Sequence, residues 1–174
     1  MGHKNESTPV ALARKSIIYY LQNRKNMIPP DDLPRELMEK QAGVFVSLKK
    51  EERLRGCIGT FLATKSNIVL EIIENAVSAA IRDPRFSPVT PDEVDKLSIS
   101  VDILSNPEEV KDIKQLNPKK YGVIVSCGFK KGLLLPDLEE VDTVERQIDI
   151  ARQKAGIYVG EDFTIERFEV KRYY

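Results

Sequence analysis

A cysteine and an arginine stand two positions apart in the segment Leu54-Arg55-Gly56-Cys57-Ile58-Gly59. If this segment is a β-strand, its alternation places Arg55, Cys57 and Gly59 on one face. Arg55 and Cys57 would then lie about 6.6 Å apart along the strand, and the arginine cation would stabilise the thiolate. The thiolate is the nucleophilic and metal-binding form of cysteine. The segment is therefore predicted to be the functional centre of the protein.

The two glycines beside the cysteine allow two interpretations. Glycine weakens a strand and buries no side chain, so Gly56 and Gly59 are expected where a ligand or another backbone approaches closely. Leu54 and Ile58 would then anchor the strand from behind. Equally, the glycines can mark a β-bulge or a crossing helix, and Cys57 can be a buried packing residue. Taken alone, the residues leave both interpretations open.

A second charged group lies in the segment Arg82-Asp83-Pro84-Arg85-Phe86. It follows an apolar helical pattern, and loops held by rigid elements often carry function. Alternatively, Asp83 pairs with Arg85 while Phe86 anchors the loop. The functional interpretation gives two candidate catalytic residues, Cys57 and Asp83. It also gives a candidate ligand-binding set comprising Arg55, Gly56, Cys57, Gly59, Arg82 and Arg85.

Residue counts exclude several kinds of site. The one histidine, His3, lies in residues 1–7, which are expected to form a disordered tail, and the cysteines are Cys57 and Cys127. No Ser-His or Cys-His dyad and no four-ligand zinc site can be built from them, and no metal or other cofactor is predicted. A nucleophilic Cys57 would need Asp83, Glu52 or water as its base. Cys127 is expected to pack within a strand.

Charge and hydropathy bound the partners and the location. Lysine plus arginine and aspartate plus glutamate both number 27, so the net charge of zero predicts no nucleic-acid partner. No apolar run approaches the roughly 18 residues of a membrane span. The polar N-terminus has no signal-peptide core, and two distant cysteines suit a reducing compartment. A cytoplasmic protein is predicted, and its oligomeric state is left open.

Periodicity predicts an α+β fold in which helices pack on one side of a largely antiparallel sheet. The 174 residues suit a single domain spanning residues 8–172. Helices are expected from Thr8 to about Asn23, from a Ser66 cap to Asp83, and from a cap within Asp142-Thr143-Val144-Glu145 to Gly156. Residues 24–40 form a long connection with one helical turn, and Thr90 to Glu93 forms a capping box. Strands are expected over residues 44–48, 54–61, 97–103, 121–127, 133–135 and 163–173, with a turn from Gly128 to Gly132.

The sequence resembles the AMMECR-type domain family, named for the Alport syndrome, midface hypoplasia and elliptocytosis chromosomal region protein. The resemblance rests on Leu54-Arg55-Gly56-Cys57-Ile58-Gly59 together with Gly43-Val44-Phe45-Val46, Asn75-Ala76, Asp83-Pro84-Arg85-Phe86, Tyr121-Gly122-Val123-Ile124-Val125, Leu134-Leu135-Pro136 and Lys154-Ala155-Gly156. It implies a larger and a smaller subdomain, intertwined, with the signature near a cleft between them. It also implies association with a Memo-type, dioxygenase-like protein and a radical-SAM protein.

Two functional hypotheses follow. In the first, the protein is a binding module in which Arg55, Cys57 and Arg85 recognise an anionic ligand or an extended segment of a partner protein, because arginine forks suit carboxylate and phosphate. In the second, it is an enzyme component with Cys57 as nucleophile or redox thiol. The first is favoured, because no convincing base accompanies the cysteine.

Overall fold

Residues 6–174 are described by a computed structural model, in which the chain divides into two units. Unit 1 contains the chain up to Ile103 together with Lys171–Tyr174, and unit 2 contains Leu104–Val170. Each unit has its own buried apolar cluster. Among residues 6–174, no helix is both long enough and apolar enough to cross a bilayer.

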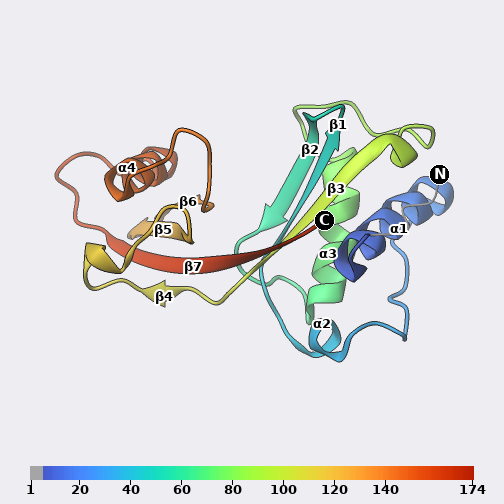
Figure 1. Cartoon of the computed structure of the whole chain (residues 1–174), viewed down its shortest axis with the longest axis horizontal. Helices are drawn as coiled ribbons and strands as arrows, with labels where there is room; N and C mark the ends of the chain where they lie inside the picture. The colour runs from blue at the N-terminus through green and yellow to red at the C-terminus, as the bar shows by residue number, and fades with distance from the viewer. Residues whose placement is uncertain (1–5) are drawn as a thin grey trace. The chain divides into compact units, whose positions relative to one another are not determined.

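The element order follows the predicted one closely (Figure 1). The first part of the chain contains α1 (Thr8–Asn23), α2 (Arg35–Glu39), β1 (Val44–Lys50), β2 (Arg53–Thr60), α3 (Ile68–Ile81) and β3 (Leu97–Leu104). The second part contains β4 (Glu108–Glu109), β5 (Tyr121–Cys127), β6 (Lys130–Leu134), α4 (Val144–Ala155) and β7 (Thr164–Tyr173). The very short β4 is the one strand without a sequence-based prediction.

Alternating apolar residues build the sheet of unit 1, whose strand order is β2-β1-β3 with antiparallel pairing. In β1, Val44, Val46 and Leu48 are fully buried on one face. Helix α3 packs on β1 and β2, and α1 packs on α3 (Figure 1). The opposite face of the sheet carries polar residues from β1 and β3. Helices therefore cover one side of this sheet, as expected.

The C-terminal end of β7 belongs to unit 1 and contributes an ion pair to it. The guanidinium of Arg172 donates from Nε and Nη2 to the two oxygens of Asp102, at 2.7 and 2.8 Å. The Asp102 side chain is only 5% exposed. Hydrogen bonding to Asp102 raises the pKa of Arg172 above its ordinary value. A buried carboxylate of this kind is stable only with a partner.

Glycine lets a helix approach a strand very closely in each unit. A Cβ atom at Gly56 in β2 would overlap the carbonyl oxygen of Ala79 in α3. In unit 2, a Cβ atom at Gly132 would overlap the carbonyl oxygen of Ala151 in α4. The expectation that Gly132 is a turn residue is therefore wrong. The turn is the shorter Gly128-Phe129 pair, with Gly128 at φ 56°, and β6 begins at Lys130.

A buried carboxylate ties α3 to the end of β2. Glu71 is 1% exposed, and it accepts hydrogen bonds from the Thr60 hydroxyl, from the backbone N–H and hydroxyl of Thr64, and from the Lys65 N–H, at 2.6–2.9 Å. Burial alone would raise the pKa of Glu71, but these hydrogen bonds lower it overall. The neighbouring Asn75 donates to the Val44 carbonyl. The apolar periodicity of this helix gives no indication of either polar contact.

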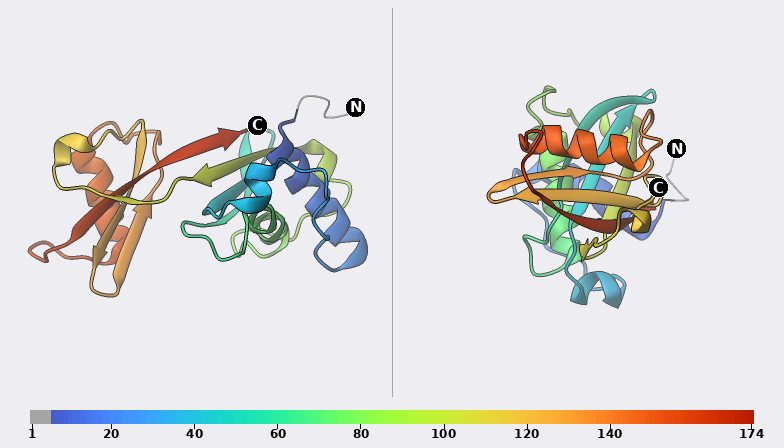
Figure 2. Two further views of the ribbon diagram at one scale, coloured as in Figure 1. Left: turned by 90° about the horizontal axis from the view of Figure 1, so that it is seen from below. Right: turned by 90° about the vertical axis from the view of Figure 1, so that its left-hand side faces the viewer.

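In unit 2 the strands pair antiparallel in the order β7-β5-β6, and β4 pairs with the other edge of β7. Helix α4 covers one face of β5 and β6 (Figure 2). Thr143 caps the helix by accepting from the Arg146 N–H, and Gly156 ends it at φ 68°. Both ends of α4 are as predicted.

Two predicted helix caps and part of the predicted tail are wrong. Helix α1 is capped at Ser7, not Thr8, and α3 at Asn67, whose side chain accepts from the Leu70 N–H. Asparagine caps as well as the predicted serine. Glu6 binds Arg14 at 2.6 Å, and the Ser7 N–H donates to the Tyr174 carbonyl, so residues 6 and 7 are held in place. Residues 1–5, including the predicted tail histidine, lie outside the described residues.

The substitution Gly56→Ala should destabilise the protein by about 3 kcal/mol, because the new methyl group must displace the backbone of α3. Chemical denaturation monitored by circular dichroism measures the change. Leu54→Ala in the same strand is the matched control. Leu54 is 42% exposed, so this variant should lose less than about 1 kcal/mol. Equal losses in the two variants would contradict the close approach at Gly56.

Candidate functional site

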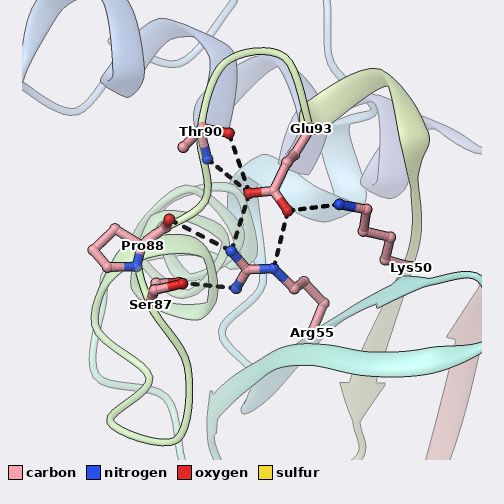
Figure 3. A network of polar contacts seen from close by, with 6 residues as sticks. All are labelled: Lys50, Arg55, Ser87, Pro88, Thr90 and Glu93. Carbon is pink, nitrogen blue, oxygen red and sulfur yellow. Dashed lines mark hydrogen bonds and ion pairs between the residues drawn. The ribbon is translucent and has the colours of Figure 1, made fainter.

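Arg55 is bound within the protein, in a network with the loop that follows α3 (Figure 3). Its guanidinium donates to both oxygens of Glu93, at 3.0 and 3.3 Å, and to the carbonyls of Ser87 and Pro88, at 2.9 and 3.4 Å. Lys50 reaches the same carboxylate at 3.0 Å. The side chains of Arg55 and Glu93 are only 14% and 15% exposed. Arg55 therefore fastens the loop to the sheet.

A β-bulge explains why the predicted faces of Leu54 and Arg55 are wrong, whereas Gly56 and Ile58 share one face of β2 and Cys57 and Gly59 the other, as predicted. Leu48 pairs with Gly56, but the next residue, Lys49, pairs with Leu54, so Arg55 is the extra residue between them. A bulge re-aims side chains and breaks the simple alternation of a strand. Arg55 thus turns to the side where Lys50 meets Glu93, and its guanidinium does not lie on the face of the Cys57 thiol. Leu54 is exposed and does not anchor the strand from behind.

Asp83 and Arg85 close the free edge of β2, the outer strand of its sheet. The Cys57 N–H donates to Asp83 Oδ2 at 2.9 Å, and Arg85 Nη2 donates to the Cys57 carbonyl at 3.1 Å. Arg85 also binds Asp83 through Nε at 2.9 Å and Nη2 at 2.7 Å. Two side chains therefore occupy the positions that a neighbouring strand would take. Unpaired sheet edges invite association, and this contact protects the edge at Cys57.

The candidate base Asp83 is fully engaged by these contacts. Its side chain is 2% exposed, and Oδ1 accepts a further hydrogen bond from the Arg85 N–H. Hydrogen bonds from the Arg85 side chain, assisted by the Cys57 N–H, hold the pKa of Asp83 far below its ordinary value. A carboxylate with so low a pKa is a weak proton acceptor near neutral pH. The geometry gives Asp83 a structural role.

The Cys57 thiol is half-buried on the face of the sheet opposite α3. It accepts a hydrogen bond from the Ser47 hydroxyl at 3.2 Å, and Ser47 is its cross-strand partner. The pKa of Arg85 is raised mainly by its hydrogen bonds to Asp83, with a smaller contribution from the charge of Cys57. The guanidinium that lies within electrostatic reach of the thiol is thus that of Arg85, whereas the sequence pointed to Arg55.

The remaining predicted site residues lie elsewhere. Gly56 is buried under α3 and has no surface to offer a ligand, and Gly59 lies against the Phe45 ring. Arg82 donates to Glu74 at 2.6 Å. Cys127 belongs to unit 2, where it is half-buried against the apolar cluster. Within residues 6–174, no three acidic, cysteine or histidine side chains are placed to hold a metal ion.

Glu93 is the residue of this network that the sequence reasoning underrated. It was expected to close a capping box, and it does accept from the Thr90 N–H at 3.1 Å. The same carboxylate also binds Arg55 and Lys50. The capping box in the sequence already places the Glu93 carboxylate directly after a loop whose backbone carbonyls can accept hydrogen bonds. Only the fold shows that Arg55 and Lys50, from two strands, reach this carboxylate.

Comparisons with known proteins give one family. The AMMECR1 family model matches residues 10–173. A protein of Thermotoga maritima is 54% identical over 94% of this chain and 95% of its own length. Protein CA_C1420 of Clostridium acetobutylicum is 50% identical over 98% of this chain, which spans only 36% of that protein. The crystal structure of uncharacterized protein PH0010 from Pyrococcus horikoshii aligns at a TM-score of 0.83, with 33% identity, over 94% of this chain and 88% of that one.

Glu93→Gln should make the protein less stable at neutral pH and less sensitive to acid. Hydrogen bonds from Arg55 and then from Thr90 lower the pKa of Glu93 from 4.5 to about 2. A lowered pKa stabilises the fold above the unfolded value, and this stability is lost as the pH falls from about 4.5 toward 2. The shift corresponds to about 3 kcal/mol at neutral pH. Urea denaturation of both proteins across this pH range measures it.

The control for that experiment is Glu39→Gln, which removes an exposed helical ion pair with Arg35. Such pairs contribute less than about 1 kcal/mol. The loss of stability of this variant at acid pH should therefore match that of the parent protein. If Glu93→Gln also followed the parent protein, the carboxylate would have no part in fastening the loop.

Proposed function

We propose that this chain, which belongs to the AMMECR1 family, is a binding module that recognises an anionic group at Arg85, beside the Cys57 thiol. The supporting observation is the state of the Arg85 guanidinium. Asp83 and the Cys57 carbonyl fix Nε and Nη2, and the guanidinium lies over the Phe86 ring at 5.5 Å. The side chain is 55% exposed, and Nη1 has no hydrogen-bond acceptor within residues 6–174. The two N–H groups of Nη1, held in one orientation, can donate to a carboxylate or phosphate.

Of the two ligand classes considered, the anionic ligand is favoured over an extended segment of a partner protein. A peptide that adds to a sheet edge needs free N–H and C=O groups on that edge. At Cys57 both groups are bound, to Asp83 and Arg85 respectively. An added strand would first have to displace this loop. An anion that approaches the exposed side of Arg85 displaces nothing.

The alternative function, an enzyme component that uses Cys57, has one observation in its favour. The half-buried thiol has a hydrogen bond from Ser47 and lies within electrostatic reach of Arg85. It lacks a base, because the hydrogen bonds of Asp83 leave that carboxylate a weak proton acceptor. Alkylation of Cys57 with a pH midpoint well below that of Cys127 would favour the enzyme over the binding module.

Partners and cellular location stay predictions. Association with a Memo-type protein and a radical-SAM protein is implied by the family resemblance, and a cytoplasmic location by the cysteine content. The extra length of the Clostridium acetobutylicum relative is compatible with a domain that works beside another polypeptide segment. Affinity purification of the tagged chain from its own cells, followed by mass spectrometry, tests the predicted partners, and fractionation of those cells tests the location.

Inorganic phosphate should protect Cys57 from alkylation if an anion binds at Arg85. The measurement follows iodoacetamide modification by peptide mass spectrometry in the folded protein, with chloride at equal ionic strength as the reference. Cys127, in unit 2, is the internal control, and its rate should not change. We expect the rate at Cys57 to fall at least threefold at saturating phosphate, because a bound anion covers the thiol and opposes its ionisation.

Arg85→Lys keeps the charge but loses Nη1 and the contacts that hold it in place, so the phosphate concentration for half protection should rise at least fivefold. Arg53→Lys, at an exposed position in the same strand, is the matched control and should leave that concentration unchanged. Thermal melting of both variants checks that they are folded. Protection that is equal in the two variants, or that extends to Cys127, would refute the assignment to Arg85.

A further inference from the structure

The face of unit 1 opposite α3 holds a hollow of about 350 Å³. Its walls come from β1, from the turn after it, from β3 and from the C-terminal end of β7. The polar lining includes Ser47, Lys49, Glu52, Ser98 and Ser100. Ligand-binding hollows of this volume accept small molecules. Apart from Ser47, which donates a hydrogen bond to Cys57, none of these residues belongs to the Arg85 site.

Strand register gathers the hydroxyl groups and the ammonium into one block. Ser47 lies directly opposite Ser100, and Lys49 directly opposite Ser98. Such cross-strand neighbours have Cβ atoms about 5 Å apart, and residues two apart on one strand are separated by about 6.6 Å. The Ser47 hydroxyl donates to Cys57. Ser98 and Ser100 remain free to donate, beside a lysine, to the oxygens of an anion.

Two opposite charges line this hollow without partners. Neither the Lys49 side chain nor the Glu52 side chain has a hydrogen bond or ion pair within residues 6–174. The third charged group, Arg172, is already bound by both oxygens of Asp102. A simple anion would be repelled by Glu52, and a simple cation by Lys49. A molecule that carries both charges satisfies both groups.

We propose that this hollow binds a small zwitterion. Lys49 and the hydroxyls of Ser98 and Ser100 hold its oxyanion, a carboxylate or a phosphate, and Glu52 holds its ammonium group. Leu54 also lines the hollow and is 42% exposed. It offers an apolar contact to the rest of the ligand, which gives this outward-facing leucine a function.

The test is a titration of the 15N-labelled full chain, followed through the backbone amide signals of Ser98 and Ser100. The zwitterionic probes are L-leucine, which carries a carboxylate, and O-phosphoethanolamine, which carries a phosphate. Acetate, inorganic phosphate and ethylammonium carry one kind of charge each. At least one zwitterion should bind at least fivefold more tightly than every probe with a single kind of charge, and the better one identifies the oxyanion.

Variants of the two charged residues complete the test. Lys49→Gln and Glu52→Gln should each weaken zwitterion binding by roughly fivefold, to the level of the probes with a single kind of charge. Lys96→Gln and Glu51→Gln, at exposed positions outside the hollow, are the matched controls and should not change it. The proposal is overturned if no probe gives a saturable shift at millimolar concentration. It is also overturned if a probe with a single kind of charge binds as tightly as the zwitterions, or if both hollow variants retain full affinity.

Discussion

Helix α3 approaches β2 so closely that the backbone of Ala79 fills the space of a side chain at Gly56. This contact constrains what surrounds it. The strand accommodates an extra residue beside the contact, and that residue, Arg55, turns toward the loop after the helix. There it meets Glu93 and two backbone carbonyls. Close helix packing, the bulge and the fastened loop therefore form one connected arrangement. The same device, with Gly132 under α4, recurs in unit 2.

Carboxylates hold several segments of unit 1 together through hydrogen bonds. Glu71, Asp83 and Glu93 each accept several hydrogen bonds, and Asp83 and Glu93 also bind arginine. Carboxylates of this kind are weak bases, because hydrogen bonds already stabilise their charged forms. The motif around Cys57 is thus rich in charge but poor in groups able to exchange protons. This balance is the physical reason to favour ligand binding over catalysis.

Local patterns predicted the fold well because each depends on neighbouring residues. The alternation of Leu97, Ile99 and Val101 sets β3, and Gly156 ends α4. The candidate site was predicted only in part, because a bulge is a tertiary feature. Moving a strand by one residue sends each side chain to the other face, and this separated Arg55 from Cys57. The sequence contains Asp83 and Arg85 but cannot show that they bind the edge of a distant strand.

The Asp102–Arg172 pair joins positions 70 residues apart within unit 1. During synthesis on the ribosome, the strand that carries Asp102 emerges long before its partner does. Unit 2 is made entirely in that interval, and it can fold while unit 1 still holds an unpaired buried carboxylate. Unit 1 therefore begins first and is completed last. The closure of unit 1 waits until the end of β7 has been made, an order that follows from connectivity alone.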